Sequence, residues 1–346
     1  MSAALRRVLV ESWNRRGVLA FLLWPVSVLY GLLTAARKGL YQVRWLAVER
    51  VPVPVVVVGN VVVGGAGKTP VTMALVKHLK RQGLKAGVIA RGYGRDGTDC
   101  REVHDDSDAS EAGDEPLLIK RSTAVPVFVA KARAQAARAL LAAYPETDIL
   151  VCDDGLQHHA LHRDLEICVF DERGIGNGLL LPAGPLREAW PRHVDLVLSS
   201  GRPLRVEGYV LRRSLASHAQ RADGKRIALD VLRGFDNQPG AQLWAVAGIA
   251  RPEAFFAMLR ARGLPLARTF ALPDHADFEP RQWPSANGQT LVCTEKDAVK
   301  LWRHHPDAWA VPLILEVEPA FWYALDKLLQ ARTGTKLSFG HGHTTS

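Results

Sequence analysis

The sequence predicts an α/β protein whose main part is a doubly wound, mostly parallel β-sheet. Short apolar runs rich in β-branched residues, such as 85–90 and 125–130, alternate with helical segments such as 131–144. Alternation of this kind is typical of parallel sheets that are covered by helices on both faces. The pattern restarts after residue 201, which predicts a second, smaller α/β domain, and an uncharged stretch at 17–36 precedes the first strand.

The individual elements follow from the composition and length of each run. Short apolar runs bounded by glycine or charge are expected to be strands, and longer segments that end at glycine are expected to be helices. We expect strands at 51–58, 85–90, 125–130, 148–152, 165–170, 194–200, 242–250 and 311–318, helices at 69–83, 131–144 and 251–263, and a strand–helix unit at 289–302. The stretch 96–116 is acidic, has no apolar period, and is expected to be a loop.

The composition is that of a globular protein with an anionic partner. The chain has 346 residues, of which 48% are hydrophobic, and its 44 basic against 35 acidic residues give a net charge of +9. Such a charge favours a membrane face, a phosphorylated substrate or nucleic acid. The basic residues are scattered and no nucleic-acid recognition motif is present, so we expect no nucleic-acid partner. The four cysteines show no paired spacing, which is typical of a reducing cytoplasm.

A glycine-rich run between the first strand and the first helix predicts a phosphate-binding loop. The run GNVVVGGAGKT places its backbone N–H groups and a helix N-terminus where they can face phosphate oxygens. Its candidate nucleotide-binding residues are Gly59, Asn60, Gly64, Gly65, Ala66, Gly67, Lys68 and Thr69. The lysine supplies charge at the β- and γ-phosphates, and the threonine hydroxyl can ligate Mg²⁺. The sequence therefore predicts a P-loop protein that binds ATP with Mg²⁺.

The loop departs from the standard spacing. The standard motif has glycine six residues before the lysine, where this chain has Val62. The run also differs from the KGGxGKT loop of dimerising ATPases, because Val63 replaces the first lysine of that motif. A strand before the run and a helix after it still provide the expected context.

Two carboxylates follow the apolar run at 148–152. Asp153 lies where P-loop folds place the carboxylate on the Mg²⁺ side, and Asp154 is next to it. Adjacent acidic residues at a strand end could equally form a simple turn. Together with the glycine-rich run, they favour a metal site that includes Thr69.

The uncharged stretch at 17–36 has several interpretations. As a helix it would be about 30 Å long, roughly one hydrocarbon thickness. A cleaved signal peptide, a spanning helix, a helix lying in the interface and a buried core helix all share these features. Because the next segment needs cytoplasmic ATP, membrane association is favoured over secretion, and whether the helix spans the bilayer stays open. The expected organisation is a membrane-associated region at 1–45, a nucleotide-binding kinase domain at 46–205, a second domain at 206–335 and a disordered tail at 336–346.

Six motifs in order give the chain a family resemblance. They are GNVVVGGAGKTP, RGYGR, GDEP, DDGLQH, LLPAGPLRE and PDHADF. With these motifs the chain resembles the tetraacyldisaccharide 4′-kinase family over nearly its whole length. The resemblance implies transfer of the ATP γ-phosphate to the 4′-hydroxyl of a lipid A disaccharide 1-phosphate, giving lipid IVA, at the cytoplasmic face of the inner membrane. We expect the enzyme to be a monomer.

The same resemblance implies roles for residues outside the phosphate loop. Asp114 is the expected base, Glu115 is expected near Mg²⁺, and His275 is expected to pair with Asp114. Arginine suits a phosphate or transition-state charge, because its planar group binds oxygens bidentately. The candidate substrate residues are Arg187, Glu188, Arg133, Arg91, Gln157 and His158.

Two other functions remain open at this point. A P-loop ATPase that drives or regulates a membrane partner would use water as the acceptor and would not need Asp114. A phosphotransferase with a soluble acceptor would use the N-terminal helix only as an anchor. The phosphate loop argues against a purely structural membrane protein.

Overall fold

The computed structural model describes residues 11–200, 208–237, 242–249, 251–274, 276, 278 and 289–334, and the chain forms two compact units. The first unit comprises 1–91, 125–211 and 317–346, and the second comprises 92–124 and 212–316. The units are therefore discontinuous, whereas the domains expected from sequence, 46–205 and 206–335, are continuous. The expected disordered tail, 336–346, lies outside the described residues.

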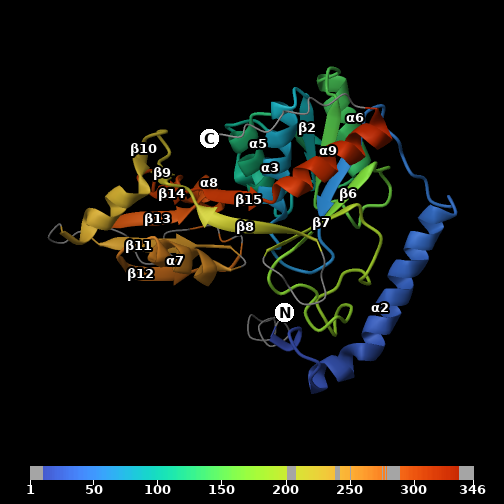
Figure 1. Ribbon diagram of the computed structural model, residues 1–346, viewed down its shortest axis with the longest axis horizontal. Helices are drawn as coiled ribbons and strands as arrows, with labels where there is room; N and C mark the ends of the chain where they lie inside the picture. Colours follow the sequence, from blue (N-terminus) through green and yellow to red (C-terminus); the bar gives the residue numbers. More distant parts are fainter. Residues whose placement is uncertain are drawn as a thin grey trace. The chain divides into compact units, whose positions relative to one another are not determined.

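The first unit contains the predicted doubly wound sheet (Figure 1). Seven neighbouring strands have the order β8-β7-β6-β1-β5-β2-β4, and every pairing between them is parallel. Their bounds are β1 Val55–Gly59, β2 Ala86–Ala90, β4 Val127–Val129, β5 Ile149–Asp153, β6 Leu165–Phe170, β7 Leu196–Ser200 and β8 Tyr209–Leu215, of which residues 212–215 are counted with the second unit. The central strands β1 and β5 are buried at every residue, as a sheet covered on both faces requires. The predicted α/β class is confirmed.

Helices of the first unit pack on this sheet. They are α3 (Lys68–Arg81), α6 (Arg133–Ala143) and α9 (Pro319–Thr333). The last helix was not expected from the sequence. It is attached to α3 by a buried hydrogen bond of 2.8 Å between His78 Nε2 and Asp326 Oδ1, and Trp322 stacks on the same imidazole with ring centroids 4.5 Å apart.

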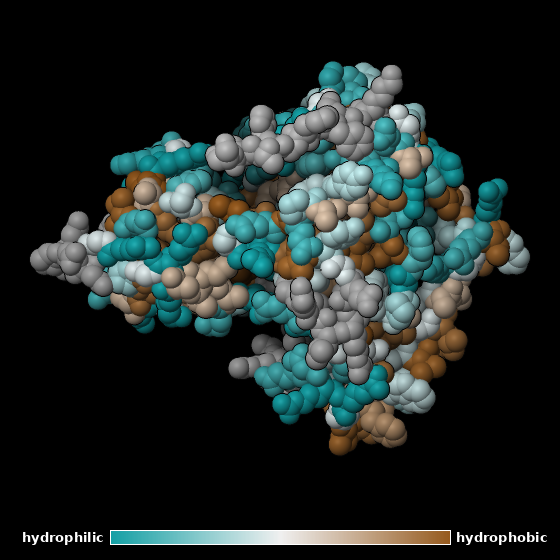
Figure 2. Space-filling view, viewed as in Figure 1, coloured by the Kyte–Doolittle hydropathy of each residue, from teal (hydrophilic) through white to brown (hydrophobic). Residues whose placement is uncertain are grey.

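The N-terminal apolar stretch forms the 25-residue helix α2 (Val18–Gln42), which continues through Pro25. Within the part of the chain that the structure describes, α2 alone is long and apolar enough to cross a membrane, judged by length and composition. Only Ala20 and Ser27 of this helix are buried. Large apolar side chains such as Phe21, Leu29 and Leu33 are exposed, and Figure 2 shows apolar residues along the edge of the molecule where α2 lies in Figure 1.

The second unit contains a six-stranded sheet with the order β10-β9-β14-β13-β11-β12. Its parallel part comprises β11 (Leu243–Ala247), β12 (Leu266–Ala271), β13 (Thr290–Thr294) and β14 (Trp309–Val311), and the antiparallel edge comprises β9 (His218–Gln220) and β10 (Arg226–Ala228). The other elements of this unit are β3 (Arg101–Glu102), β15 (Leu313–Val317), α4 (Ala109–Ala112), α5 (Asp114–Thr123), α7 (Pro252–Ala261), α8 (Glu295–Leu301) and the 3₁₀ helix η1 (Leu229–Asn237). Apolar clusters lie on both faces of the sheet, around Phe256 and around Phe278.

Two expectations about local structure were wrong. The stretch 96–116 is not one loop, because it contains β3, α4 and the start of α5. Helix α4 is only four residues long and is capped by the Asp108 carboxylate, which accepts a 2.7 Å hydrogen bond from the backbone N–H of Ser110, so no apolar period develops in the sequence. The single strand expected at 311–318 is two strands, β14 and β15, because Pro312 between them has no N–H to donate.

Candidate active site

The phosphate loop joins the carboxyl end of β1 to the N-terminus of α3. Gly64 and Gly67 have positive φ angles of 103° and 81°, which glycine adopts without strain. Gly67 is the N-cap of α3 and no side chain caps this helix end, so its first N–H groups remain available to phosphate oxygens. Lys68 and Thr69 are the first two residues of α3.

The structure explains why valines replace the usual residues at the start of the loop. Val61 and Val62 are buried, and Val62 forms an antiparallel bridge with Leu186. The Arg187 N–H donates to the Val61 carbonyl at 2.7 Å, and the Val63 N–H donates to the Pro185 carbonyl at 2.8 Å. The loop is therefore held by the segment 185–187, and the apolar side chains fill the contact that this pairing creates.

Asp153 and Asp154 lie beside the phosphate loop because β5 pairs with β1, with Val58 opposite Asp153. The Asp153 carboxylate is buried and accepts a 2.7 Å hydrogen bond from the Thr72 hydroxyl on α3. Asp154 has a φ angle of 49°, in the left-handed region that non-glycine residues rarely adopt. Strain of this kind is typical of functional sites.

Three cations surround Asp154. Its Oδ1 lies 3.6 Å from Lys68 Nζ, its Oδ2 lies 3.4 Å from Arg187 Nη1, and its backbone carbonyl accepts a 3.1 Å hydrogen bond from Arg133 Nη2. Burial alone would raise the pKa of Asp154, but the charges of Lys68, Arg187 and Arg133 hold the pKa below its usual value. Asp154 is therefore ionised at neutral pH, and the predicted residues Lys68, Asp154, Arg187 and Arg133 form one cluster.

The donor set beside the loop fits Mg²⁺. Thr69 and Asp153 are both buried next to the helix N-terminus, and Asp154 Oδ1 is buried without a hydrogen-bond donor. Within the described residues, no three acidic, histidine or cysteine side chains gather as a metal-binding group. Mg²⁺ in phosphotransferases needs only one or two carboxylates, because substrate phosphates and water complete its octahedron. Thr69, Asp153 and Asp154 would hold the ion, and the ion would neutralise charge on the phosphates.

Gln157 and Glu188 form a bridge between the loop and a buried charge network. Gln157 Nε2 donates to the Asn60 carbonyl at 2.9 Å and to Glu188 Oε1 at 2.8 Å, and its Oε1 accepts from Arg187 Nη1 at 3.5 Å. The other carboxylate oxygen of Glu188 lies 3.2 Å from Arg192 Nη1. Both oxygens of Glu188 are therefore engaged within the protein.

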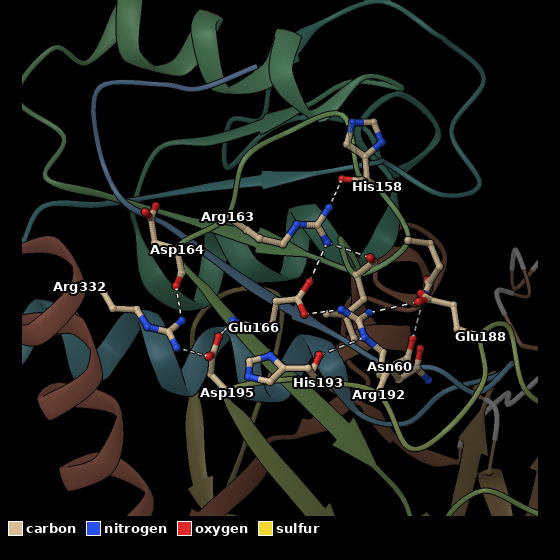
Figure 3. A network of polar contacts seen from close by, with 12 residues as sticks. Asn60, His158, Arg163, Asp164, Glu166, Glu188, Arg192, His193, Asp195 and Arg332 are labelled. Atoms are coloured by element: carbon tan, nitrogen blue, oxygen red, sulfur yellow. Dashed lines mark hydrogen bonds and ion pairs between the residues drawn. The ribbon is translucent and has the colours of Figure 1, made fainter. Parts of the chain in front are cut away.

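The network continues away from the loop (Figure 3). Arg192 pairs with Glu166 as well as Glu188, and Glu166 also lies 2.9 Å from Arg163 Nη1. The Arg192 side chain is only 8% exposed. Arg163, Glu166 and Arg192 were not predicted as site residues. A charged residue inside the apolar run 165–170 was the available signal, because a buried charge requires a partner.

His158 and Arg91 lie at the edge of this cluster. The imidazole Nε2 of His158 accepts a 3.3 Å hydrogen bond from the Arg133 N–H, which requires that nitrogen to be unprotonated. Burial and the positive charges of Arg133 and Arg163 lower the pKa of His158 to about 4. The imidazole is therefore neutral at pH 7. Arg91 is exposed and its charge contributes to the same shift.

The other predicted residues belong to the second unit. Gly113 caps α5 with a φ angle of 89°, and Asp114, its first residue, is 5% exposed. Asp114 Oδ1 lies 3.2 Å from Lys300 Nζ, while Lys296 Nζ lies 3.6 Å from Glu115 Oε1 and 3.1 Å from Asp274 Oδ1. Burial alone would lower the pKa of Lys296, but the carboxylates of Glu115 and Asp274 raise it above its usual value.

His275 follows Asp274 and lies outside the described residues. The two lysines of α8 were not predicted as site residues. Their spacing of four places them on one face of the helix, which is the signal that the sequence offered.

The fold and the first-unit site define a P-loop nucleotide-binding protein of the kinase class. A lysine and a threonine open the helix after a glycine-rich loop, and carboxylates end the neighbouring parallel strand. Residues 19–330 match the sequence model of the family described as tetraacyldisaccharide-1-P 4′-kinase. The chain belongs to this family.

Relatives named tetraacyldisaccharide 4′-kinase match almost the whole chain. It is 58% identical over 332 residues to the tetraacyldisaccharide 4′-kinase of Acidovorax sp. (strain JS42), covering 95% of each chain. It is 55% identical to that of Polaromonas naphthalenivorans (strain CJ2), covering 99% of this chain and 100% of the relative. Its structure resembles the crystal structure of the "apo" form of LpxK from Aquifex aeolicus in complex with ATP, with a TM-score of 0.77, 27% identity and coverage of 91% and 100%.

Proposed function

We propose that this protein transfers the γ-phosphate of ATP to the 4′-hydroxyl of tetraacyldisaccharide 1-phosphate, giving lipid IVA in lipid A biosynthesis. The observation that carries the proposal is the cluster of Lys68, Arg187 and Asp154 beside the phosphate loop, in a chain of this family. The cluster brings together a lysine that can bind the γ-phosphate and a carboxylate that can hold the metal ion. Phosphoryl transfer by P-loop proteins requires both groups.

The nucleotide half of the reaction is assigned to the first unit. The N–H groups at the start of α3 bind the phosphates, and Lys68 stabilises charge on the β- and γ-phosphates. Thr69, Asp153 and Asp154 would hold Mg²⁺, and the ion would supply positive charge to the phosphate oxygens. Lys68 and Arg187 pair with Asp154 in the structure, and both cations are proposed to contact the phosphates of the nucleotide.

The acceptor half is assigned to Asp114. A carboxylate that touches the attacking hydroxyl orients it and accepts its proton as the phosphoryl group transfers. The Lys300 ammonium lies 3.2 Å from Asp114 Oδ1. Glu115 is proposed to contribute near Mg²⁺, and His275 to pair with Asp114.

The proposed substrate and the exposed helix α2 both support a location at the membrane. The acceptor carries four acyl chains and is a membrane lipid, and α2 exposes Phe21, Leu29, Leu33 and other apolar side chains. We assign the protein to the cytoplasmic face of the inner membrane, where ATP is present. Deleting residues 1–38 should move the protein from the membrane fraction to the supernatant; unchanged partition would place the membrane contact elsewhere.

A direct assay tests the proposed reaction. Purified protein in detergent is incubated with γ-labelled ATP, Mg²⁺ and tetraacyldisaccharide 1-phosphate, and lipids are separated from nucleotides by chromatography. Label in the lipid supports the kinase. Release of labelled phosphate to water, with none in the lipid, would contradict it and favour the membrane ATPase.

A further inference from the structure

One face of helix α2 contacts the rest of the protein, and the small residues Ser27 and Gly31 lie on this face. Ser27 is 3% exposed although its neighbours Val26 and Val28 are 53% and 42% exposed. The Ser27 hydroxyl donates to the Leu180 carbonyl at 2.9 Å and accepts from the Ala183 N–H at 2.9 Å. A membrane anchor alone does not need such contacts.

One helical turn further, Gly31 lets the same segment approach closely. A Cβ atom at Gly31 would lie 2.7 Å from Leu180 Cδ1, closer than two carbon atoms can be. On the same helix, a Cβ at Gly39 would meet no atom within 4 Å. A side chain at position 31 would therefore displace the Leu180 side chain, whereas one at position 39 would meet no atom of the protein within 4 Å of its Cβ.

The segment that α2 contacts also holds the phosphate loop. Leu180 forms a bridge with Leu186, which in turn pairs with Val62 of the loop. The Tyr30 hydroxyl donates to the carbonyl of Arg187 at 3.0 Å, and the N–H of Arg187 donates to the Val61 carbonyl. The backbone of Arg187 is thus held by α2 on one side and by the phosphate loop on the other.

The position of the Arg187 side chain depends on this backbone. Its guanidinium lies 3.4 Å from Asp154 Oδ2 and 3.5 Å from Gln157 Oε1, which are long distances for charge-assisted contacts. A guanidinium that is held weakly by its own contacts relies on its backbone for orientation. Tyr30 supplies one of the hydrogen bonds that fix this backbone.

We propose that Tyr30 is a positioning residue for Arg187, and that the contact of α2 with residues 180–187 aligns the phosphate site as well as attaching the protein to lipid. The inference rests on the proposed kinase function. The path runs from Tyr30 to the Arg187 backbone and then to the guanidinium beside the phosphates. Displacing α2 should therefore slow phosphoryl transfer even when membrane affinity is kept.

Two glycine variants separate positioning from attachment. Gly31→Leu and Gly39→Leu add the same apolar side chain to α2, so neither should weaken binding to vesicles of phosphatidylethanolamine and phosphatidylglycerol. Gly31→Leu should lower kcat by about 10-fold, because the added side chain pushes against Leu180, which pairs with Leu186, with the KM for ATP changed less than about 2-fold. Gly39→Leu should keep the wild-type kcat. Equal kcat values for the two variants would overturn the proposal.

A subtler variant removes only the hydrogen bond. Tyr30→Phe should lower kcat by about 3- to 10-fold, the usual worth of one hydrogen bond, with unchanged vesicle binding and melting temperature. Tyr323→Phe, at an exposed position on α9, should have no effect. In an Arg187→Ala background, Tyr30→Phe should cause no further loss, because the two residues act in one path. A full additional loss there would contradict the assignment.

The outcomes also separate this inference from the proposed function. If the wild-type protein does not label the lipid, the kinase proposal fails. If the wild-type protein labels the lipid and Tyr30→Phe and Gly31→Leu do so at the same rate, the kinase proposal stands and the positioning role of α2 is wrong.

Discussion

The ammonium group of Lys68 lies 3.6 Å from the Asp154 carboxylate, across the carboxyl ends of two parallel strands. Lys68 begins the helix after β1, and Asp154 follows β5, so the pairing of these strands brings the two side chains together. In the structure each of these charges neutralises the other. Under the proposed function, Lys68 would pair with phosphate oxygens and Asp154 would help to hold Mg²⁺.

Replacing Lys68 with methionine should abolish lipid phosphorylation, because the γ-phosphate loses its cation while the packing of the side-chain stem is kept. We expect a loss of at least about 10³-fold, given that one electrostatic contact to transition-state charge is worth about 10²–10³-fold and Lys68 is also a binding residue. Lys77→Met, on the exposed face of the same helix, is the control. Near-normal turnover of Lys68→Met would contradict the proposal that this loop binds the phosphates of ATP.

Replacing Asp114 with alanine should lower kcat by about 10²-fold or more while ATP affinity is retained, as expected for loss of a general base. Isothermal titration with ATP and Mg²⁺ measures the second part. A loss confined to ATP affinity would instead make Asp114 a metal ligand. Lys300→Met removes its 3.2 Å ion-pair partner and should lower kcat less than Asp114→Ala, with partial recovery in Lys300→Arg.

Removing Arg192 should destabilise the first unit. The change Arg192→Met leaves the partly buried carboxylates of Glu166 and Glu188 without their shared cation, which should cost about 3 kcal/mol of unfolding free energy. Urea unfolding measures this cost. Adding Glu188→Gln to the variant should recover part of the loss, since Glu188 then no longer carries the charge that Arg192 neutralised, whereas Glu166 keeps Arg163. Unchanged stability in the single variant would mean that water replaces the guanidinium.

Acid should destabilise the protein through His158. The pKa of this imidazole is about 4 in the folded protein, against about 6.5 in an unfolded chain. Between these values the unfolded state binds the proton and the folded state does not, so the stabilisation is complete above about pH 6.5 and is lost as the pH falls towards 4. His158→Gln keeps an acceptor for the Arg133 N–H and should reduce the fall in unfolding free energy between pH 7 and 5. An equal fall in unfolding free energy in the wild-type protein and in His158→Gln would contradict this role of His158.

Local patterns in the sequence were sufficient to predict much of the first unit. The strands at 85–90, 148–152 and 165–170 and the phosphate loop follow from short apolar runs and glycine spacing, which are properties of neighbouring residues. The parallel pairing rule then placed Lys68 and Asp154 at one sheet edge. Helix α9 was missed because its attachment depends on distant partners, such as His78 for Asp326.

Contacts between residues that lie far apart in the sequence could not be predicted from the sequence. Glu188 was predicted as a substrate residue, and in the structure its two oxygens contact Gln157 and Arg192. Nothing in the spacing of Tyr30 and Arg187, 157 positions apart, predicts that α2 contacts the segment beside the phosphate loop. Such contacts depend on the path of the chain between them.

The measurement that tests the central claim most directly is the position of the new phosphate on the lipid. The product formed from tetraacyldisaccharide 1-phosphate, ATP and Mg²⁺ is analysed by proton–phosphorus correlation NMR. The account predicts a new phosphate ester coupled to the proton at the 4′ carbon, in product from the wild-type protein and not from Lys68→Met. Consumption of ATP with free phosphate as the only new phosphorus species would contradict it.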